Sequence, residues 1–219
     1  MGVYFKIFKK LNYFDLDVEC SMGNELMVIE GLSGAGKTTI LNCIAGIRTP
    51  DAGKISVDDR ILFSHNEKVN IPAEKRNIGY LFQNYALFPN MSVRSNVLYG
   101  IRNKKEYKKK ESKKELIEYA EHMMDTLGIS HLADKRPTAI SGGEKQRVAL
   151  ARAMVTKPSL ILLDEPFSAL DESTKETVYE EFLQFKETLK IPTILITHNH
   201  KESELFADRQ ISLEKGRII

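Results

Sequence analysis

Cysteine is scarce in this chain of 219 residues, which contains Cys20 and Cys43 alone. The two cysteines do not form a CxxC spacing, and the histidines do not cluster with them. The sequence therefore favours neither a disulfide framework nor a zinc site, and it suits a reducing compartment. The core has to form by packing alone, for which 42% hydrophobic residues in a chain of this length suffice.

Long apolar runs are missing as well. Runs such as residues 160–163 and 194–196 are far shorter than the roughly 18 to 20 residues that a bilayer-spanning helix needs. The first residues show no signal-peptide pattern. We therefore expect that the chain does not itself span a membrane.

Charge of one sign is concentrated in a single segment. The formal net charge is only +2, but residues 103–114 hold seven lysines and two glutamates. Such a run could contact anionic lipid or nucleic acid, although a solvated helix or loop is the simpler interpretation. We assign the segment no function and expect no nucleic-acid partner.

The first third of the chain has the pattern of β-structure. Residues 5–30 combine alternating and short apolar runs that predict two or three strands, and residues 53–63 and 77–82 also predict strands. Between these strands, residues 37–45 predict a helix that ends at Gly46. This part of the chain is expected to form a β lobe and the start of the core.

The remainder of the chain is first helical and then mixed. From about residue 91 to residue 154 the composition is helical and charged, without good strand candidates. The apolar runs 159–163 and 193–197 then flank a helix predicted over 173–189, which is the rhythm of a parallel sheet buried on both faces. We expect an α/β fold with a parallel-sheet core, an N-terminal antiparallel β lobe and an inserted α-helical subdomain.

A glycine-rich segment between a predicted strand and a predicted helix matches the P-loop pattern GxxxxGK[ST]. Glycines let consecutive backbone N–H groups turn inward, and the positive end of the following helix complements phosphate charge. Lys37 adds a positive charge near the β and γ phosphates, the Thr38 hydroxyl can ligate the Mg²⁺ that bridges them, and Thr39 can assist. The pattern predicts an ATP and Mg²⁺ site made of Gly31, Leu32, Ser33, Gly34, Ala35, Gly36, Lys37, Thr38 and Thr39.

Residues 160–165, LILLDE, predict a hydrophobic strand that ends in two carboxylates, the Walker B arrangement. Successive strand residues face opposite sides, so Asp164 can hold Mg²⁺ while Glu165 can reach the water that attacks the γ phosphate. A general base needs a site that raises its proton affinity or fixes its geometry, and closure of a dry interface would supply both. An apolar strand ending in acids is common by itself, so this interpretation depends on the P-loop.

The segment TAISGGEKQR resembles the signature motif of the ABC ATPases, commonly LSGGQ, and it precedes the Walker B strand as it does in that family. Ile140 and Glu144 depart mildly from the commonest letters of the motif. Ser141, Gly142 and Gly143 would open a helix and form a second anion site. The resemblance implies that this second site completes the nucleotide pocket of an opposing subunit.

Other landmarks of the family follow in the expected order. Gln83 resembles the Q-loop glutamine, which implies a role with Mg²⁺, with the attacking water and in coupling to a transmembrane partner. The segment SALD, which ends at Asp171, resembles the D-loop at the dimer seam and implies a place for Asp171 at the nucleotide site. His198 resembles the switch histidine that contacts the γ phosphate, but Asn199 stands where the family often has Asp, which leaves the fine tuning of the switch open.

The adenine contact stays open at this point. The family stacks an aromatic side chain of the β lobe on adenine, but residues 8–14 do not align clearly with that pattern. Tyr13, Phe8 or the non-aromatic Leu11 could take the place, and core packing is the alternative interpretation for each.

As the resemblance implies, the whole chain is one P-loop NTPase domain of the ABC ATPase type. Its β lobe and core would cover about residues 1–83, a helical subdomain about 84–153 and the continued core 154–219, without the C-terminal regulatory domain that many relatives carry. ATP would join two subunits head to tail, as a homodimer or a heterodimer, and hydrolysis would separate them. We expect an ATP-hydrolysing subunit at the cytoplasmic face of the cell membrane, with transmembrane permease subunits and an extracytoplasmic binding protein as partners.

The cargo is indicated only by resemblance. Residues 72–83 and 87–97 are similar to the ATPases of bacterial and archaeal importers, most of all to the molybdate, tungstate and sulfate group, with polyamine, iron and sugar importers nearby. Residues 84–98 are apolar enough to dock on a permease, although packing inside the helical lobe explains them equally well.

Two other classes share part of these motifs. An ABC protein of DNA repair or translation would need a long coiled-coil insertion or tandem cassettes, and the sequence has neither. A small-molecule kinase or GTPase would share the P-loop but would not need the SGG segment, Gln83 or His198.

Overall fold

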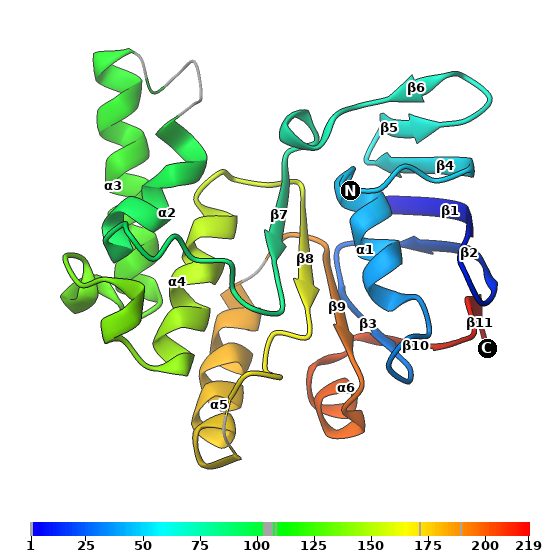
Figure 1. Cartoon of the computed structure of the whole chain (residues 1–219). Helices are drawn as coiled ribbons and strands as arrows, with labels where there is room; N and C mark the ends of the chain where they lie inside the picture. The colour runs from blue at the N-terminus through cyan, green and yellow to red at the C-terminus, as the bar shows by residue number, and fades with distance from the viewer. Residues whose placement is uncertain (1, 103–106, 108, 171, 189) are drawn as a thin grey trace. The chain divides into compact units, whose positions relative to one another are not determined.

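This computed structural model describes residues 2–102, 107, 109–170, 172–188 and 190–219. The N-terminal strands form an antiparallel sheet (Figure 1). Its strands are β1 Val3–Lys10, β2 Asp15–Met22, β4 Ala52–Val57, β5 Arg60–Ser64 and β6 Val69–Asn70. The order is β2-β1-β4-β5-β6, with β1 between β2 and β4. Buried apolar and exposed polar side chains alternate along the whole of β2, which confirms the strand predicted from alternation.

The strand structure predicted over residues 53–63 consists of two strands. A turn at Asp58 and Asp59 separates β4 from β5, and Asp58 has a φ of 51°. Aspartate tolerates this left-handed region at turns because its short side chain can bond locally. The two strands pair with each other as a hairpin.

The second sheet carries the predicted parallel core. Its strands are β3 Leu26–Glu30, β7 Ile78–Leu81, β8 Leu160–Asp164, β9 Thr193–Thr197, β10 Arg209–Glu214 and β11 Arg217–Ile218. The order is β11-β10-β3-β9-β8-β7, and β9 pairs in parallel with both β3 and β8. Every residue of β8 and β9 is buried, as expected for strands covered on both faces. Because these strands are parallel, their carboxyl ends meet at one edge of the sheet, where ligands bind in folds of this kind.

Two helices accompany these sheets, α1 Lys37–Ala45 and α6 His200–Phe206, together with a 3-10 turn at Ala73–Lys75. The prediction of a helix over residues 37–45 that ends at Gly46 is confirmed, and Gly46 has a φ of 81°. Arg76, fully buried, closes the end of α1 by donating to the carbonyl oxygens of Cys43 and Ile44 at 2.9 and 2.8 Å. A positive charge at this end of a helix is favourable because the carbonyl groups there carry partial negative charge.

The middle of the chain is helical, as predicted. Its helices are α2 Val93–Arg102, α3 Lys110–Thr126, α4 Gly142–Met154 and α5 Glu172–Thr188, with 3-10 turns at Ser130–Leu132 and Pro137–Ala139. Both α2 and α3 pack against α4. The contacts divide the chain into a sheet unit of Met1–Tyr80, Ser159–Glu165 and Lys190–Ile219 and a helical unit of Leu81–Pro158 and Pro166–Leu189.

Helix α5 belongs to the helical unit, whereas the sequence pattern places it in the continued core after residue 153. The reason is tertiary packing inside the helical unit. Arg147 of α4 forms an ion pair with Glu181 of α5. The Phe167 ring meets the rings of Tyr179 and Phe182 edge to face, with centroids 5.0 and 5.3 Å away.

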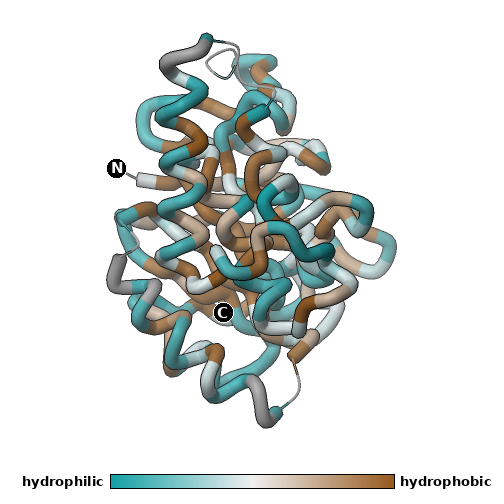
Figure 2. Tube along the Cα trace, turned by 90° about the vertical axis from the view of Figure 1, so that its left-hand side faces the viewer, coloured by the Kyte–Doolittle hydropathy of each residue, from teal (hydrophilic) through white to brown (hydrophobic). Residues whose placement is uncertain are grey.

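Hydropathy along the trace follows burial. Figure 2 shows short hydrophobic and hydrophilic segments alternating along the trace, and many buried apolar residues of the two sheets and α1 form one core cluster. Among the residues that the structure describes, none of the helices is both long and apolar enough to cross a bilayer.

Candidate functional site

The glycine-rich loop connects β3 to α1 at the carboxyl edge of the parallel sheet. A Cβ atom at Gly31 would lie 2.3 Å from the carbonyl oxygen of Leu213, so no larger residue fits where the loop begins. Gly36 precedes the first residue of α1 with a φ of 108°, a conformation that side chains rarely adopt. The loop therefore has the backbone that the motif requires, and its middle residues Leu32, Ser33 and Gly34 are exposed.

Lys37 folds back over this loop. Its Nζ donates to the carbonyl oxygens of Gly31 at 2.6 Å and Leu32 at 3.0 Å, and the residue is almost fully buried. Burial lowers the pKa of Lys37, while Glu165 and Asp164 act in the opposite direction. The ammonium group thus lies over the loop and within the field of both carboxylates.

Asp164, at the end of β8, meets the start of α1. Its Oδ1 accepts a hydrogen bond from Thr38 Oγ1 at 3.1 Å, and its Oδ2 accepts one from Tyr80 Oη at 3.1 Å. Burial raises the pKa of Asp164, against the lowering effect of these two hydrogen bonds. Burial and the neighbouring carboxylate raise the pKa of Tyr80, so its hydroxyl is a donor at any ordinary pH. Tyr80 could not be recognised as part of the site from the sequence, because a tyrosine in a short strand gives no signal of its partner.

Glu165 follows Asp164 with a φ of 45°, which is uncommon for a residue with a side chain. Its backbone N–H donates to the carbonyl oxygen of Ile196 at 3.0 Å, which fixes the end of β8 to β9. Its Oε1 lies 3.2 Å from Nδ1 of His198, the residue that follows β9. Strained backbone of this kind is common at functional sites, and here it directs a carboxylate toward an imidazole.

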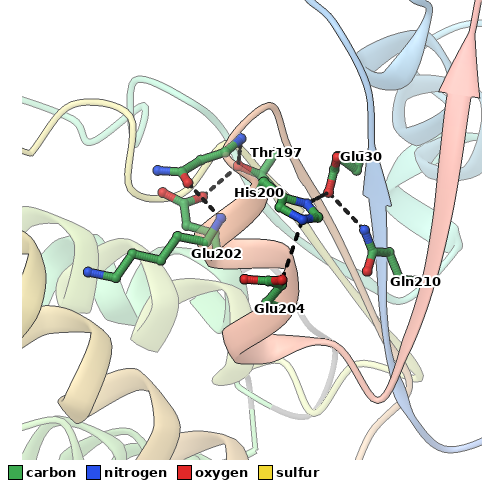
Figure 3. Close-up of polar contacts among 8 residues, drawn as sticks. Glu30, Thr197, His200, Glu202, Glu204 and Gln210 are labelled. Carbon is green, nitrogen blue, oxygen red and sulfur yellow. Dashed lines mark hydrogen bonds and ion pairs between the residues drawn. The ribbon is translucent and has the colours of Figure 1, made fainter.

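The segment after β9 is held by polar contacts that Figure 3 shows. His200 Nδ1 lies 3.0 Å from Glu30 Oε2, and Gln210 donates to the same oxygen at 2.8 Å. His200 Nε2 also lies 3.4 Å from Glu204. The hydrogen bond between His200 and Glu30 raises the pKa of the histidine and lowers the pKa of the glutamate. The strand that enters the P-loop is therefore linked to α6, a connection for which the sequence carries no local signal.

Asn199 caps α6 in place of the aspartate that the family often has. Its Oδ1 accepts from the backbone N–H of Lys201 at 3.0 Å, and its own N–H donates to Thr197 Oγ1 at 3.0 Å. Thr197 in turn donates to Glu202 Oε2 at 2.6 Å inside the protein (Figure 3). Asparagine and aspartate are comparable caps, so the exchange preserves the shape of the segment that carries His198.

The SGG segment begins α4 in the helical unit. Ser141 and Glu144 form a reciprocal capping box, in which Glu144 N–H donates to Ser141 Oγ at 3.3 Å and Ser141 N–H donates to Glu144 Oε2 at 2.7 Å. The glutamate that departs from the commonest motif letters thus stabilises the helix start. A Cβ at Gly142 would lie 3.2 Å from the Leu170 side chain, so the segment packs closely against the residues before position 171.

Some of the predicted residues lie together in the sheet unit, and others belong to the helical unit. Lys37, Thr38, Asp164, Glu165 and His198 lie at one edge of the sheet unit. The exposed residue Gln83 and the SGG segment belong to the helical unit. Asp171 lies outside the described residues.

The three candidates for an adenine contact differ in exposure. Tyr13, in the turn between β1 and β2, is 95% exposed. Phe8 is half-buried in β1, and Leu11 is half-buried and packs against the core cluster. Of the three, Tyr13 is therefore the candidate whose ring can stack on a ligand without giving up packing inside the protein.

Comparison with known proteins gives a family and several relatives. The ABC transporter family matches residues 13–168. The molybdenum import ATP-binding protein ModC of Vibrio parahaemolyticus is 39% identical over 205 residues, which are 94% of this chain and 52% of that protein. The molybdate/tungstate import ATP-binding protein WtpC of Archaeoglobus fulgidus is 40% identical over 211 residues, with 96% and 82% coverage.

Two further similarities widen the comparison. The Fe(3+) ions import ATP-binding protein FbpC of Haemophilus influenzae is 42% identical over 195 residues, which are 89% of this chain and 54% of that protein. A solved structure of cbiO1 from Clostridium perfringens, part of the ABC transporter complex cbiONQ, matches with a TM-score of 0.81 and 26% identity over 99% of this chain and 86% of that one. Apart from WtpC, these curated relatives are about twice as long as the part that this chain matches.

Proposed function

The chain belongs to the ABC transporter family, and on that basis we propose that it is an ATP-binding and ATP-hydrolysing subunit that powers transport across a membrane. The observation that supports the proposal most is the convergence of Lys37, Thr38, Asp164, Glu165 and His198 at one edge of the parallel sheet. A phosphate loop, a metal-binding carboxylate and a second carboxylate for the attacking water are the groups that phosphoryl transfer to water needs.

The P-loop would hold the triphosphate of ATP. The N-terminal end of α1 would complement the phosphate charge, and Lys37 Nζ would move from the carbonyl oxygens of Gly31 and Leu32 to the β and γ phosphates. Thr38 Oγ1 and Asp164 Oδ1, 3.1 Å apart, are the hard oxygen donors that fit Mg²⁺, and Gln83 would be a further ligand. When bound, Mg²⁺ neutralises phosphate charge and fixes the phosphate geometry.

Glu165 would act as the general base of hydrolysis. Its carboxylate would accept a proton from a water as the water oxygen bonds to the γ phosphorus and the bond to the ADP oxygen breaks. His198 lies 3.2 Å from this carboxylate and would hold it in place while contacting the γ phosphate. The left-handed backbone at Glu165 supports this role, because it fixes the direction in which the carboxylate leaves the sheet.

Two subunits would form each complete site. The Ser141 oxygen accepts a hydrogen bond at the start of its own helix. The hydroxyl proton and the N–H groups of Gly142 and Gly143 would therefore bind the γ phosphate of the opposing subunit. Asp171 would lie along the seam between subunits. ATP would then stabilise the closed pair, which its products do not, and this difference in affinity can drive a conformational cycle.

We further propose that Tyr13 stacks on adenine. An aromatic ring that is 95% exposed loses little by moving, and it gains apolar contact when a base covers it. Phe8 and Leu11 would have to leave partly buried positions to do the same.

The relatives support a proposal for the partners and the cargo. We propose a cytoplasmic position on the membrane, with permease subunits docked near residues 84–98 and an extracytoplasmic binding protein that delivers an oxyanion such as molybdate, tungstate or sulfate. The names of the ModC and WtpC relatives support an oxyanion. Fe(3+) import is the second candidate, because FbpC matches at similar identity.

The activity is tested by replacing the proposed base. Glu165→Gln should bind ATP normally and lower turnover by roughly 100-fold or more, because proton acceptance by the carboxylate is lost. Glu67→Gln, at an exposed glutamate of the β lobe, is the matched control and should keep full turnover. Lys37→Ala should lose ATP binding itself. Normal hydrolysis by the Glu165→Gln chain would refute the base role, and wild-type ATP affinity in the Lys37→Ala chain would refute the phosphate site.

A further inference from the structure

Tyr80 connects three elements next to the proposed Mg²⁺ site. From β7, its hydroxyl reaches Asp164 Oδ2 on β8 at 3.1 Å and lies 3.2 Å from Asn42 Oδ1 on α1. Asn42 stands one helical turn after Thr38, so α1 presents both residues on the same face. The phenol and the threonine thus both donate to a single carboxylate, and the asparagine oxygen lies beside the phenol.

The orientation of the Asp164 carboxylate depends on its hydrogen bonds inside the protein. The residue is 5% exposed, so bulk water does not hold it, and its two oxygens have different partners. Thr38 donates to Oδ1, whereas Tyr80 donates to Oδ2. Because Thr38 is itself a proposed metal ligand, its oxygen would also bind the ion, whereas the Tyr80 hydroxyl contacts the other oxygen of Asp164.

We infer that Tyr80 is a positioning residue for the metal site, which holds Asp164 through Oδ2 so that Oδ1 faces the ion beside Thr38. The inference rests on the proposed function, since it presumes that Asp164 and Thr38 hold Mg²⁺. A hydrogen-bond donor behind a metal-binding carboxylate fixes its rotation, and the loss of such an outer partner typically weakens metal binding about 10- to 100-fold.

The position of the ring supports a role for the hydroxyl beyond packing. Tyr80 is half-buried and packs partly against the core cluster, which phenylalanine would do equally well. The hydroxyl is directed at a carboxylate, which is the stronger acceptor of its two neighbours because it is charged. Tyr80→Phe therefore separates the two contributions, because it keeps the ring and removes only the donor.

The test measures metal binding directly rather than turnover. Mn²⁺ is added in steps to the protein saturated with a non-hydrolysable ATP analogue, and electron paramagnetic resonance measures the Mn²⁺ that stays free. Binding of a fluorescent ATP analogue is measured separately in EDTA. We expect Tyr80→Phe to weaken Mn²⁺ binding about 10-fold, as outer partners of metal ligands do, and to leave nucleotide affinity in EDTA unchanged. Tyr4→Phe is the matched control, because Tyr4 Oη also donates to a carboxylate, that of Glu19 at 2.9 Å, on the surface of the β lobe.

Mn²⁺ affinity that is unchanged or higher in Tyr80→Phe would overturn the inference, and so would an equal loss in Tyr4→Phe. If thermal melting shows that Tyr80→Phe is unfolded, Tyr80→Met replaces it, because methionine fills the space without a donor. Asp164→Asn separates the two proposals. If that change leaves Mn²⁺ affinity at the wild-type value, the proposed metal site fails and the inference fails with it. If Asp164→Asn loses Mn²⁺ but Tyr80→Phe does not, only the inference fails.

Discussion

Arg76 offers a stability prediction that can be worked out from its contacts. Its side chain is fully buried behind α1, and its guanidinium group donates four hydrogen bonds. The acceptors are the carbonyl oxygens of Cys43 and Ile44 at the end of α1, the carbonyl oxygen of Ile71 and Asn70 Oδ1. Arg76→Met keeps the length of the stem but removes every one of these donors.

The expected loss is large. Hydrogen bonds to a charged group contribute about 1.5 to 3 kcal/mol each, and a buried acceptor left without a donor costs about 1 to 3 kcal/mol. The cost of burying the guanidinium, which also lowers the pKa of Arg76, offsets part of this gain. We therefore expect Arg76→Met to lower the free energy of unfolding by about 3 to 5 kcal/mol, because four acceptors lose their donor at about 1 kcal/mol or more each.

Urea unfolding followed by circular dichroism measures this change as a shift of the midpoint. Arg60→Met is the matched control, because Arg60 is exposed and makes one hydrogen bond, to the carbonyl oxygen of Lys75. The control should change the free energy of unfolding by less than about 1 kcal/mol, as surface substitutions do. A loss below about 1 kcal/mol for Arg76→Met would refute the account of a guanidinium that closes α1.

The remaining predictions concern the P-loop and the contacts of α6. Gly31→Ala should abolish ATP binding, because its Cβ would lie 2.3 Å from a backbone oxygen of β10, whereas Gly23→Ala has open space around its Cβ and should bind ATP normally in the same assay. His200→Gln should lower the melting temperature in a pH-dependent manner. The pKa of His200 is raised by Glu30, so its contribution is full below the unfolded value of about 6.5 and is lost as pH rises through the folded pKa. The pKa of Glu30 is lowered, so its contribution is present above about pH 4.5 and is lost as pH falls through the folded pKa. The effect of His200→Gln should therefore be largest between about pH 5 and 6.5, and an effect that grows toward pH 9 would contradict this reasoning.

The elements that carry the site could be predicted because their signals are local. The helix of residues 37–45 begins after a glycine-rich loop and ends at a glycine, and both ends agree with the structure. The strands at 160–164 and 193–197 are short apolar runs, and both are buried at every residue. Motif order then associates Lys37 with Asp164, although more than a hundred residues separate them in the chain.

The contacts that position the site could not be predicted, because they join distant residues without a periodic signal. Tyr80 and Asp164 are in contact although they lie 84 positions apart in the sequence, and Glu30 and His200 are in contact although they lie 170 positions apart. A buried arginine such as Arg76 would be expected on the surface from composition alone. The grouping of α5 with the helical unit likewise depends on side-chain packing, which the sequence pattern does not encode.

In the proposed mechanism, a triphosphate joins two copies, each of which supplies half of a site. Sedimentation of the Glu165→Gln chain with and without ATP and Mg²⁺ measures this most directly. We expect a monomer without nucleotide and a dimer with it, and a return to the monomer when Ser141 is also replaced by a bulky residue. A wild-type chain that hydrolyses ATP at full rate as a strict monomer, with Ser141 dispensable, would contradict the claim.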